Sequence, residues 1–108
     1  MKDWQSELQA EFERARQARA RGNEGQARVC ARRAAGIAAR EYFTRRGEKI
    51  RTPSAYDLLS RLAQDPSLSS ELRQAAAYLT LRVNEEFKLP VSVDLIAEAR
   101  KLCDGLVK

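Results

Sequence analysis

The 108 residues of this chain match the commonest size of one domain, so we expect a single domain over residues 1–108 with one hydrophobic core. Apolar residues make up 44% of the chain, but Gly and Pro number only five and three, which excludes a sandwich or barrel with many turns. The formal net charge is +5, with the basic excess in residues 1–51, and no run approaches the ~18 apolar residues of a membrane span.

The first predicted helix spans roughly residues 3–21. Apolar side chains recur there at steps of three and four, which places them on one helical face: Trp4, Leu8, Phe12, Ala15 and Ala18. Asp3 is the expected N-cap, because its carboxylate can accept a backbone N–H of the first turn. Gly22 fits the left-handed position after the helix, and Asn23 with Gln26 fits the start of the next one. The connection is short, so the first two helices are expected to pack antiparallel.

The second predicted helix, about residues 24–46, combines small side chains with a basic flank. One stripe consists of Ala27, Ala31, Ala34, Ala38 and Tyr42, and its small residues allow a neighbouring helix to approach closely. Beside the stripe, the basic flank is formed by four arginines within about 140° of one another: Arg28, Arg32, Arg33 and Arg40. Arginine presents a planar fork that suits phosphate and carboxylate. The flank is interpreted either as an anion-binding face or as a solvated surface, and both interpretations stay open.

The third predicted helix is short, about residues 53–64. Thr52 is the expected N-cap and Pro53 the first helical residue, because proline has no N–H to leave unpaired at that position. Three leucines at helical spacing are expected to face inward: Leu58, Leu59 and Leu62.

The fourth predicted helix begins after the break at residues 65–67 and continues to about residue 86. Its apolar stripe comprises Leu72, Ala75, Ala76, Leu79 and Val83. Pro90 ends that register, and Ser92 is the expected cap of a fifth helix, with Val91 and Ile96 as a hydrophobic staple. The inner face of the fifth helix carries Ile96, Ala99, Leu102, Cys103 and Leu106.

The sequence therefore predicts an all-α fold, an up-and-down helical bundle of four to five helices, because every periodic segment is helical. The predicted core comprises Trp4, Leu8, Phe12, Ala34, Ile37, Leu59, Leu62, Leu72, Leu79, Val83, Ile96, Leu102 and Leu106. Cys30 and Cys103 belong to no CxxC pair, so we expect buried, reduced thiols. The N-terminal residues form no signal-peptide core, which predicts a cytoplasmic protein.

The residues that most catalytic sites need are missing. The chain contains no histidine, which removes the usual general base at neutral pH and the common helical zinc motif. The five glycines form neither GxGxxG nor GxxxxGK. Glu85 and Glu86 are adjacent, so on a helix they point about 100° apart and are interpreted as a solvated face. We therefore expect no enzyme activity, no cofactor and no bound metal.

Several segments, taken in order, resemble one known family. After a helix pair with an Ala-rich second helix come TPSAYDLL (52–59), a helix ending in LRVNEEF (81–87), the pair LP (89–90) and a last helix with AEA (97–99). This order resembles the HEPN family, the nucleotide-binding domains of higher eukaryotes and prokaryotes. Many members are metal-independent ribonucleases that use an Arg, a polar residue soon after it, and a His a few residues beyond.

Arg82 and Asn84 match the first part of the family motif. The place of the His is taken by Phe87, Lys88 or Leu89, none of which exchanges a proton near neutral pH as imidazole does. The resemblance thus implies a divergent member that binds phosphate groups without cleaving RNA. It also implies a homodimer that brings the two Arg82 regions together, and a nucleotidyltransferase-like or toxin–antitoxin partner.

The predicted nucleotide- or RNA-binding site consists of Arg82 and Asn84, extended by Arg32, Arg33 and Arg40 of the basic flank. Three alternatives stay open. The chain is instead a protein-interaction or assembly module with no nucleic-acid role, whose basic flank meets an acidic partner. A second alternative is a ribonuclease that uses Arg82 with Lys88 or another substitute acid in place of the histidine. In the third, Arg82 only forms a salt bridge with a nearby carboxylate.

Overall fold

Five helices form the described part of the fold, which contains no strand. The computed structural model describes residues 3–81 and 93–107. The helices are α1 (Trp4–Ala20), α2 (Glu24–Arg45), α3 (Ala55–Ala63), α4 (Ser70–Leu79) and α5 (Leu95–Leu106). This arrangement confirms the predicted all-α bundle. Across these residues, no helix is both long enough and apolar enough to span a membrane.

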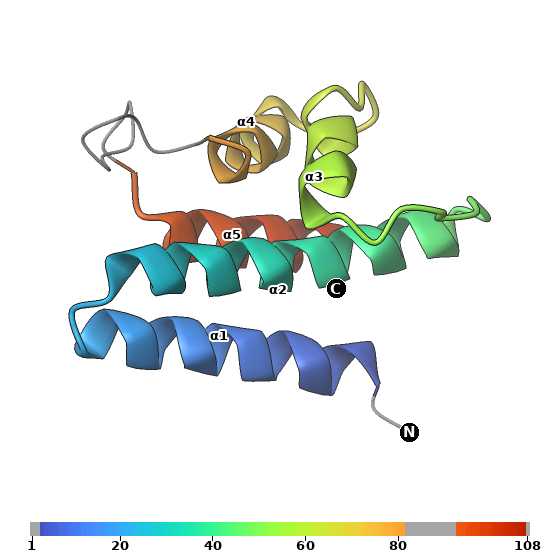
Figure 1. Ribbon diagram of the computed structural model, residues 1–108. Coiled ribbons are helices and arrows are strands. Elements are labelled where there is room, and N and C mark those ends of the chain that lie inside the picture. Colours follow the sequence, from blue (N-terminus) through green and yellow to red (C-terminus); the bar gives the residue numbers. More distant parts are fainter. Residues whose placement is uncertain (1–2, 82–92, 108) are drawn as a thin grey trace.

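α1 and α2 form the predicted antiparallel hairpin, and α5 runs beside α2 in the same direction (Figure 1). Asp3 is the N-cap of α1, as expected: its Oδ1 accepts the backbone N–H of Ser6 at 2.6 Å. Gly22 has a φ of +79°, and the side chain of Asn23 accepts the N–H of Gln26 at 3.0 Å. The turn between the two helices therefore has the chemistry that the sequence predicted.

Arg19 ties α5 to this hairpin. Its guanidinium donates to both carboxylate oxygens of Glu24, at 2.9 and 2.7 Å, and to Oδ1 of Asp94 at 2.9 Å. Asp94 in turn accepts the N–H groups of Ile96 and Ala97 at the start of α5. Burial opposes ionisation of Asp94, but the hydrogen bonds from Ala97 and Arg19 outweigh it and lower the pKa of this carboxyl. One ion cluster thus joins the α1–α2 turn to the start of α5.

The core surrounds the Ala-rich face of α2, which packs against α1, α3 and α5. A Cβ added at Gly36 would lie 2.6 Å from the Cβ of Ala55, so the start of α3 rests directly on α2. Of the predicted core, these side chains are buried: Leu8, Phe12, Ala34, Leu59, Leu62, Leu79, Leu102 and Leu106. Trp4, Ile37, Leu72 and Ile96 are only partly buried, and Val83 lies outside the described residues.

Both cysteines are buried free thiols, as predicted. Burial raises the pKa of Cys103 to about 12, so its thiol stays protonated at neutral pH. Cys30 is 1% exposed and receives a weak hydrogen bond from the side chain of Gln26. The two residues act as core side chains.

α3 begins at Ala55, so the predicted cap at Thr52 and the helical position of Pro53 are wrong. The cap is Ser54, whose Oγ accepts the N–H of Asp57 at 3.2 Å. The Thr52 hydroxyl accepts the N–H of Ser54 and donates to Oδ2 of Asp57 at 2.9 Å. The Thr52 side chain is used in this local turn, which competes with helix capping. Ser54, rather than Thr52, therefore caps α3.

α4 ends at Leu79 rather than near residue 86, and the predicted cap at Ser92 is wrong because Asp94 caps α5. At the end of α4, the Thr80 hydroxyl donates to the carbonyl of Ala77 at 2.7 Å. The side chain of Arg32 donates to the carbonyl of Leu79 at 2.6 Å. These side chains occupy carbonyls that a longer helix would use for its own N–H groups. The predicted staple partner Val91 lies outside the described residues.

Candidate functional site

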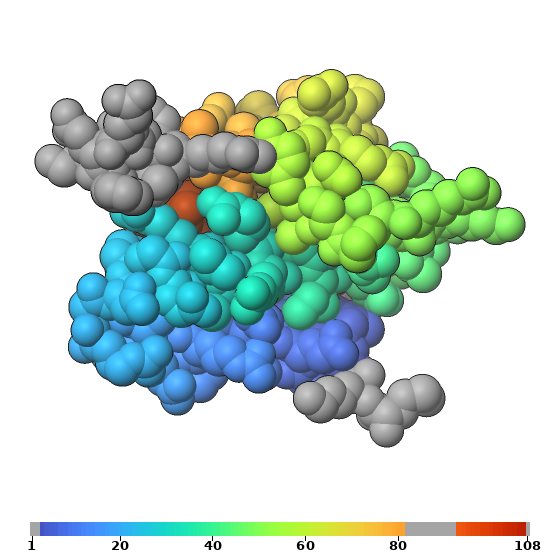
Figure 2. Space-filling view, in the orientation of Figure 1, coloured from blue at the N-terminus to red at the C-terminus, as the bar shows by residue number. Residues whose placement is uncertain are grey.

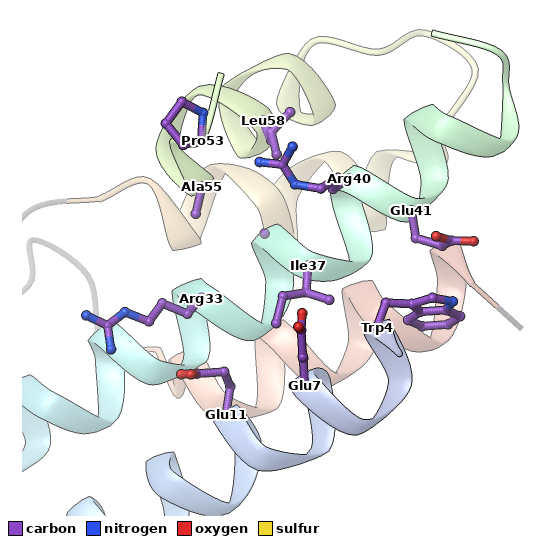
Figure 3. Close-up of a pocket in the computed structure, with 11 residues that line it drawn as sticks. Trp4, Glu7, Glu11, Arg33, Ile37, Arg40, Glu41, Pro53, Ala55 and Leu58 are labelled. Atoms are coloured by element: carbon purple, nitrogen blue, oxygen red, sulfur yellow. The ribbon is translucent and has the colours of Figure 1, made fainter. Parts of the chain in front are cut away.

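A groove of about 340 Å³ opens where α1, α2 and the segment entering α3 meet (Figure 3). Its charged lining comprises Glu7 and Glu11 from α1, and Arg33, Arg40 and Glu41 from α2. Its apolar lining comprises Trp4, Ile37, Pro53, Ala55 and Leu58. We call this feature the α2 groove. It combines apolar surface with charges of both signs.

Helical spacing explains which side chains line the α2 groove. Positions i, i+4 and i+7 share one helical face, so Arg33, Ile37 and Arg40 form a row along α2. On the face shown in Figure 2, α2 lies between α1 and α3. The groove is lined by this row of α2 together with residues of α1 and of α3. Glu7 and Glu11, four residues apart, form a facing row on α1.

Arg33 and Arg40 are exposed and keep hydrogen-bond donors available. Among the described residues, Arg33 has no hydrogen bond or ion pair. Arg40 donates one bond, from Nη2 to the carbonyl of Thr52 at 2.9 Å, which leaves its other N–H groups for a ligand. Figure 3 shows Arg33 toward one end of the groove, with Trp4 and Glu41 toward the other.

The carboxylates of the α2 groove do not neutralise these arginines. Glu11 pairs with Arg14 at 2.6 Å, and Glu41 pairs with Arg45 at 3.0 Å. Glu7 is exposed and has no ion pair within the residues that the structure describes. In that part of the chain, no ion pair joins Arg33 or Arg40 to any of the three. Opposite charges thus face each other across the groove without pairing.

Arg32 points elsewhere. Its Nε donates to the carbonyl of Leu79 at 2.6 Å and its Nη2 to that of Leu81 at 3.2 Å. The guanidinium therefore lies at the C-terminal end of α4, where unpaired carbonyls and the helix dipole favour a cation. The structure brings Arg33 and Arg40 together at one groove and places Arg32 on another side of α2.

The other two predicted site residues, Arg82 and Asn84, lie outside the described residues. Most other arginines of the described surface are engaged with acids, namely Arg14, Arg16, Arg19, Arg45, Arg46 and Arg61. The guanidinium of Arg100 lies 3.9 Å from the ring centre of Phe12. Within the described ranges, no group of three or more His, Cys, Asp or Glu side chains could hold a metal ion.

Sequence reasoning missed the acidic side of the groove. Glu7 and Glu11 were interpretable only as the polar face of the first helix, since nothing local shows how α1 is rotated relative to α2. The one sequence signal that could have indicated a shared groove is spacing: Glu7 and Glu11 are four residues apart, as are Arg33 and Ile37. No family model, no curated protein and no solved structure matches this chain. The HEPN resemblance therefore stays a prediction.

Proposed function

We propose that this chain is a non-catalytic, HEPN-like module that binds the phosphate groups of a nucleotide or an RNA. The observation that carries the proposal is that Arg33 and Arg40 reach one groove with hydrogen-bond donors to spare. Guanidinium groups bind phosphate through two parallel N–H bonds, so two of them beside a groove favour an anionic ligand.

The proposal excludes turnover because the whole chain has no histidine. Metal-independent RNA cleavage needs a group that accepts and returns a proton near neutral pH, and imidazole is the ordinary one. Arginine remains protonated throughout this range, so Arg33 and Arg40 can hold a phosphate but cannot act as bases.

In this proposal Arg32 supports the site rather than contacting the ligand, because its guanidinium holds the end of α4. The chain continues from Leu81 directly into Arg82 and Asn84, which we propose as further phosphate contacts on the strength of the family resemblance. A homodimer and a nucleotidyltransferase-like or toxin–antitoxin partner are proposed on the same basis. Sedimentation at micromolar concentration tests the dimer, and a clean monomer would count against it.

The second candidate function is a protein-interaction module, favoured by the mixed lining of the α2 groove. Trp4, Ile37 and Pro53 provide apolar surface beside the three carboxylates. Protein interfaces combine apolar centres with polar rims, whereas phosphate sites concentrate positive charge. If the groove serves a protein, phosphate compounds should not compete for it.

Fluorescence anisotropy with labelled single-stranded RNA, together with titration by inorganic pyrophosphate, separates the two functions. We expect weak binding whose logarithm falls with that of salt by roughly 0.7 per neutralised phosphate. Arg33→Ala and Arg40→Ala should each weaken binding by about fivefold, which corresponds to about 1 kcal/mol. The matched control is Arg16→Ala, because Arg16 is exposed on the outer side of α1 and pairs with Glu13.

The same RNA is assayed for cleavage. Cleavage by the wild-type chain would refute the non-catalytic part of the proposal. Equal losses in Arg16→Ala and Arg33→Ala would show that net charge, rather than the α2 groove, attracts the ligand. Binding that is absent or independent of salt would favour the protein-interaction function.

A further inference from the structure

The two exposed arginines of the α2 groove occupy separate places along it. Arg33 and Arg40 are seven residues apart on α2, which is about 10 Å along the helix axis at about 1.5 Å per residue. Between them, Gly36 packs so closely against α3 that an added Cβ would lie 2.6 Å from the Cβ of Ala55. Figure 3 shows the Arg33 side chain extending toward one end of the groove, away from Arg40. The two guanidinium groups therefore do not share one binding position.

A hydrogen bond holds Arg40 in its place. Its Nη2 donates to the carbonyl of Thr52 at 2.9 Å, in the segment that enters α3. Moving this guanidinium toward Arg33 would break that bond, which opposes the movement. Arg33 is exposed and has no hydrogen bond or ion pair among the described residues, so its side chain is free to follow a ligand. Because one guanidinium is held and the other begins two helical turns away, a ligand that contacts both must span that distance.

The surface between the two arginines differs on its two sides. Toward α3 it is apolar, with Ile37 and Pro53 both accessible in the lining of the groove. Toward α1 it is acidic, although two of the three carboxylates that line the groove are already paired with other arginines. The third, Glu7, has no ion pair within the described ranges. Like charges repel, so an anionic chain is favoured along α2 and the segment entering α3 rather than along α1.

We propose that the α2 groove holds a single-stranded stretch of nucleic acid, with one phosphate on Arg33 and a different phosphate on Arg40. A stacked strand rises about 3.4 Å per nucleotide, so three steps match the separation of about 10 Å, and a more extended strand needs fewer. The sugars and bases between these phosphates lie over the uncharged side chains of Ile37 and Pro53. This inference rests on the proposed phosphate binding. It narrows the ligand from phosphate compounds in general to strands of several nucleotides.

The test is a series of ligands of increasing length, titrated into the full chain and followed by amide chemical-shift changes. The probes are AMP and the 5′-phosphorylated di-, tri-, tetra- and hexaadenylates. AMP and the dinucleotide are too short to reach both arginines, so the amides around Arg33 and Arg40 should titrate with different midpoints. With the tetranucleotide they should titrate together. Its affinity should exceed that of the dinucleotide by about tenfold, because the second contact becomes intramolecular.

Two variants of equal charge provide the control. Arg33→Ala should remove the step, so that the tetranucleotide binds no more than about twofold more tightly than the dinucleotide. Arg16→Ala removes the same charge from the outer side of α1 and should keep the step. A wild type without the step, or a step that survives in Arg33→Ala, would overturn the bridging strand while leaving phosphate binding intact. Pyrophosphate that binds as tightly as the tetranucleotide would also overturn it, because pyrophosphate is too short to span the arginines. If no probe binds, the proposed function fails and the bridging strand with it.

Discussion

Replacing Arg32 by Met should destabilise the protein, whereas the same change at its neighbour Arg33 should not. The Arg32 guanidinium donates to the carbonyls of Leu79 and Leu81 at 2.6 and 3.2 Å, at the end of α4. Hydrogen bonds from a charged donor contribute about 1.5–3 kcal/mol, and partial exposure of Arg32 places the pair near the lower end. Loss of both bonds and of the favourable helix dipole should therefore cost about 2–3 kcal/mol.

Urea unfolding followed by circular dichroism measures this difference. Such a loss is a large part of the roughly 5–15 kcal/mol that stabilises a domain, and it should lower the melting temperature by at least about 10 °C. Arg33→Met should stay within about 0.5 kcal/mol of the wild type, because Arg33 is exposed and unpaired in the described residues. Arg32→Lys keeps the charge but cannot donate to both carbonyls, so its free energy of unfolding should lie between those of Arg32→Met and Arg33→Met.

The ligand assay should give the opposite order. Arg33→Met should weaken phosphate binding by about fivefold, while Arg32→Met, at a temperature where it remains folded, should bind as the wild type does. Equal unfolding midpoints for Arg32→Met and Arg33→Met would refute the assignment of Arg32 to the end of α4. Loss of binding in both variants would restore Arg32 to the ligand site.

Three further outcomes follow from the packing and the ion pairs. Gly36→Ala should cost about 1–3 kcal/mol, despite the better helix propensity of alanine, because its Cβ would meet the Cβ of Ala55 at 2.6 Å; thermal melting checks this. Leu79→Ala should cost about 2–5 kcal/mol in urea unfolding, because Leu79 is fully buried at the end of α4. Hydrogen bonds from Ser67, together with an ion pair to an arginine, lower the pKa of Asp65 from 3.8 to about 2 against the effect of burial. A depressed folded-state pKa stabilises the fold above the unfolded value, so this contribution should be lost as pH falls from about 4 to 2, and unfolding of Asp65→Asn should lack that pH dependence.

The helices were predictable because their signals are local. Asp3 and Asn23 cap the first two helices through bonds to residues only three positions away, and Gly22 takes the left-handed conformation that a short turn needs. Information of this range is fully present in the sequence. The predicted start of α3 was wrong because local chemistry offers two candidate caps. Thr52 and Ser54 both have a suitable hydroxyl within one turn, and the local sequence does not show which of them caps the helix.

The end of α4 was not predictable from local pattern. In the sequence, the helical spacing of apolar residues continues to Val83. However, the carbonyl of Leu79, which a longer helix would use for one of its own N–H groups, accepts a hydrogen bond from Arg32, which lies 47 residues earlier in the chain. A cap supplied by a distant side chain leaves no trace in the segment that it ends. The boundary therefore depends on how α4 packs against α2, which only the tertiary structure gives.

The same distinction divides the basic flank. A helical projection places Arg32 and Arg33 about 100° apart and Arg33 with Arg40 on one face, so the pairing at the groove was available from spacing. What the projection omits is the identity of the neighbours on each side of α2. The end of α4 packs on the side of α2 that carries Arg32, and the Arg32 guanidinium donates to carbonyls there. On the other side, between α1 and α3, Arg33 and Arg40 remain exposed opposite Glu7. Adjacent arginines of equal intrinsic chemistry thus acquire different roles from the helices that pack beside them, and the Arg32→Met and Arg33→Met comparison measures that difference directly.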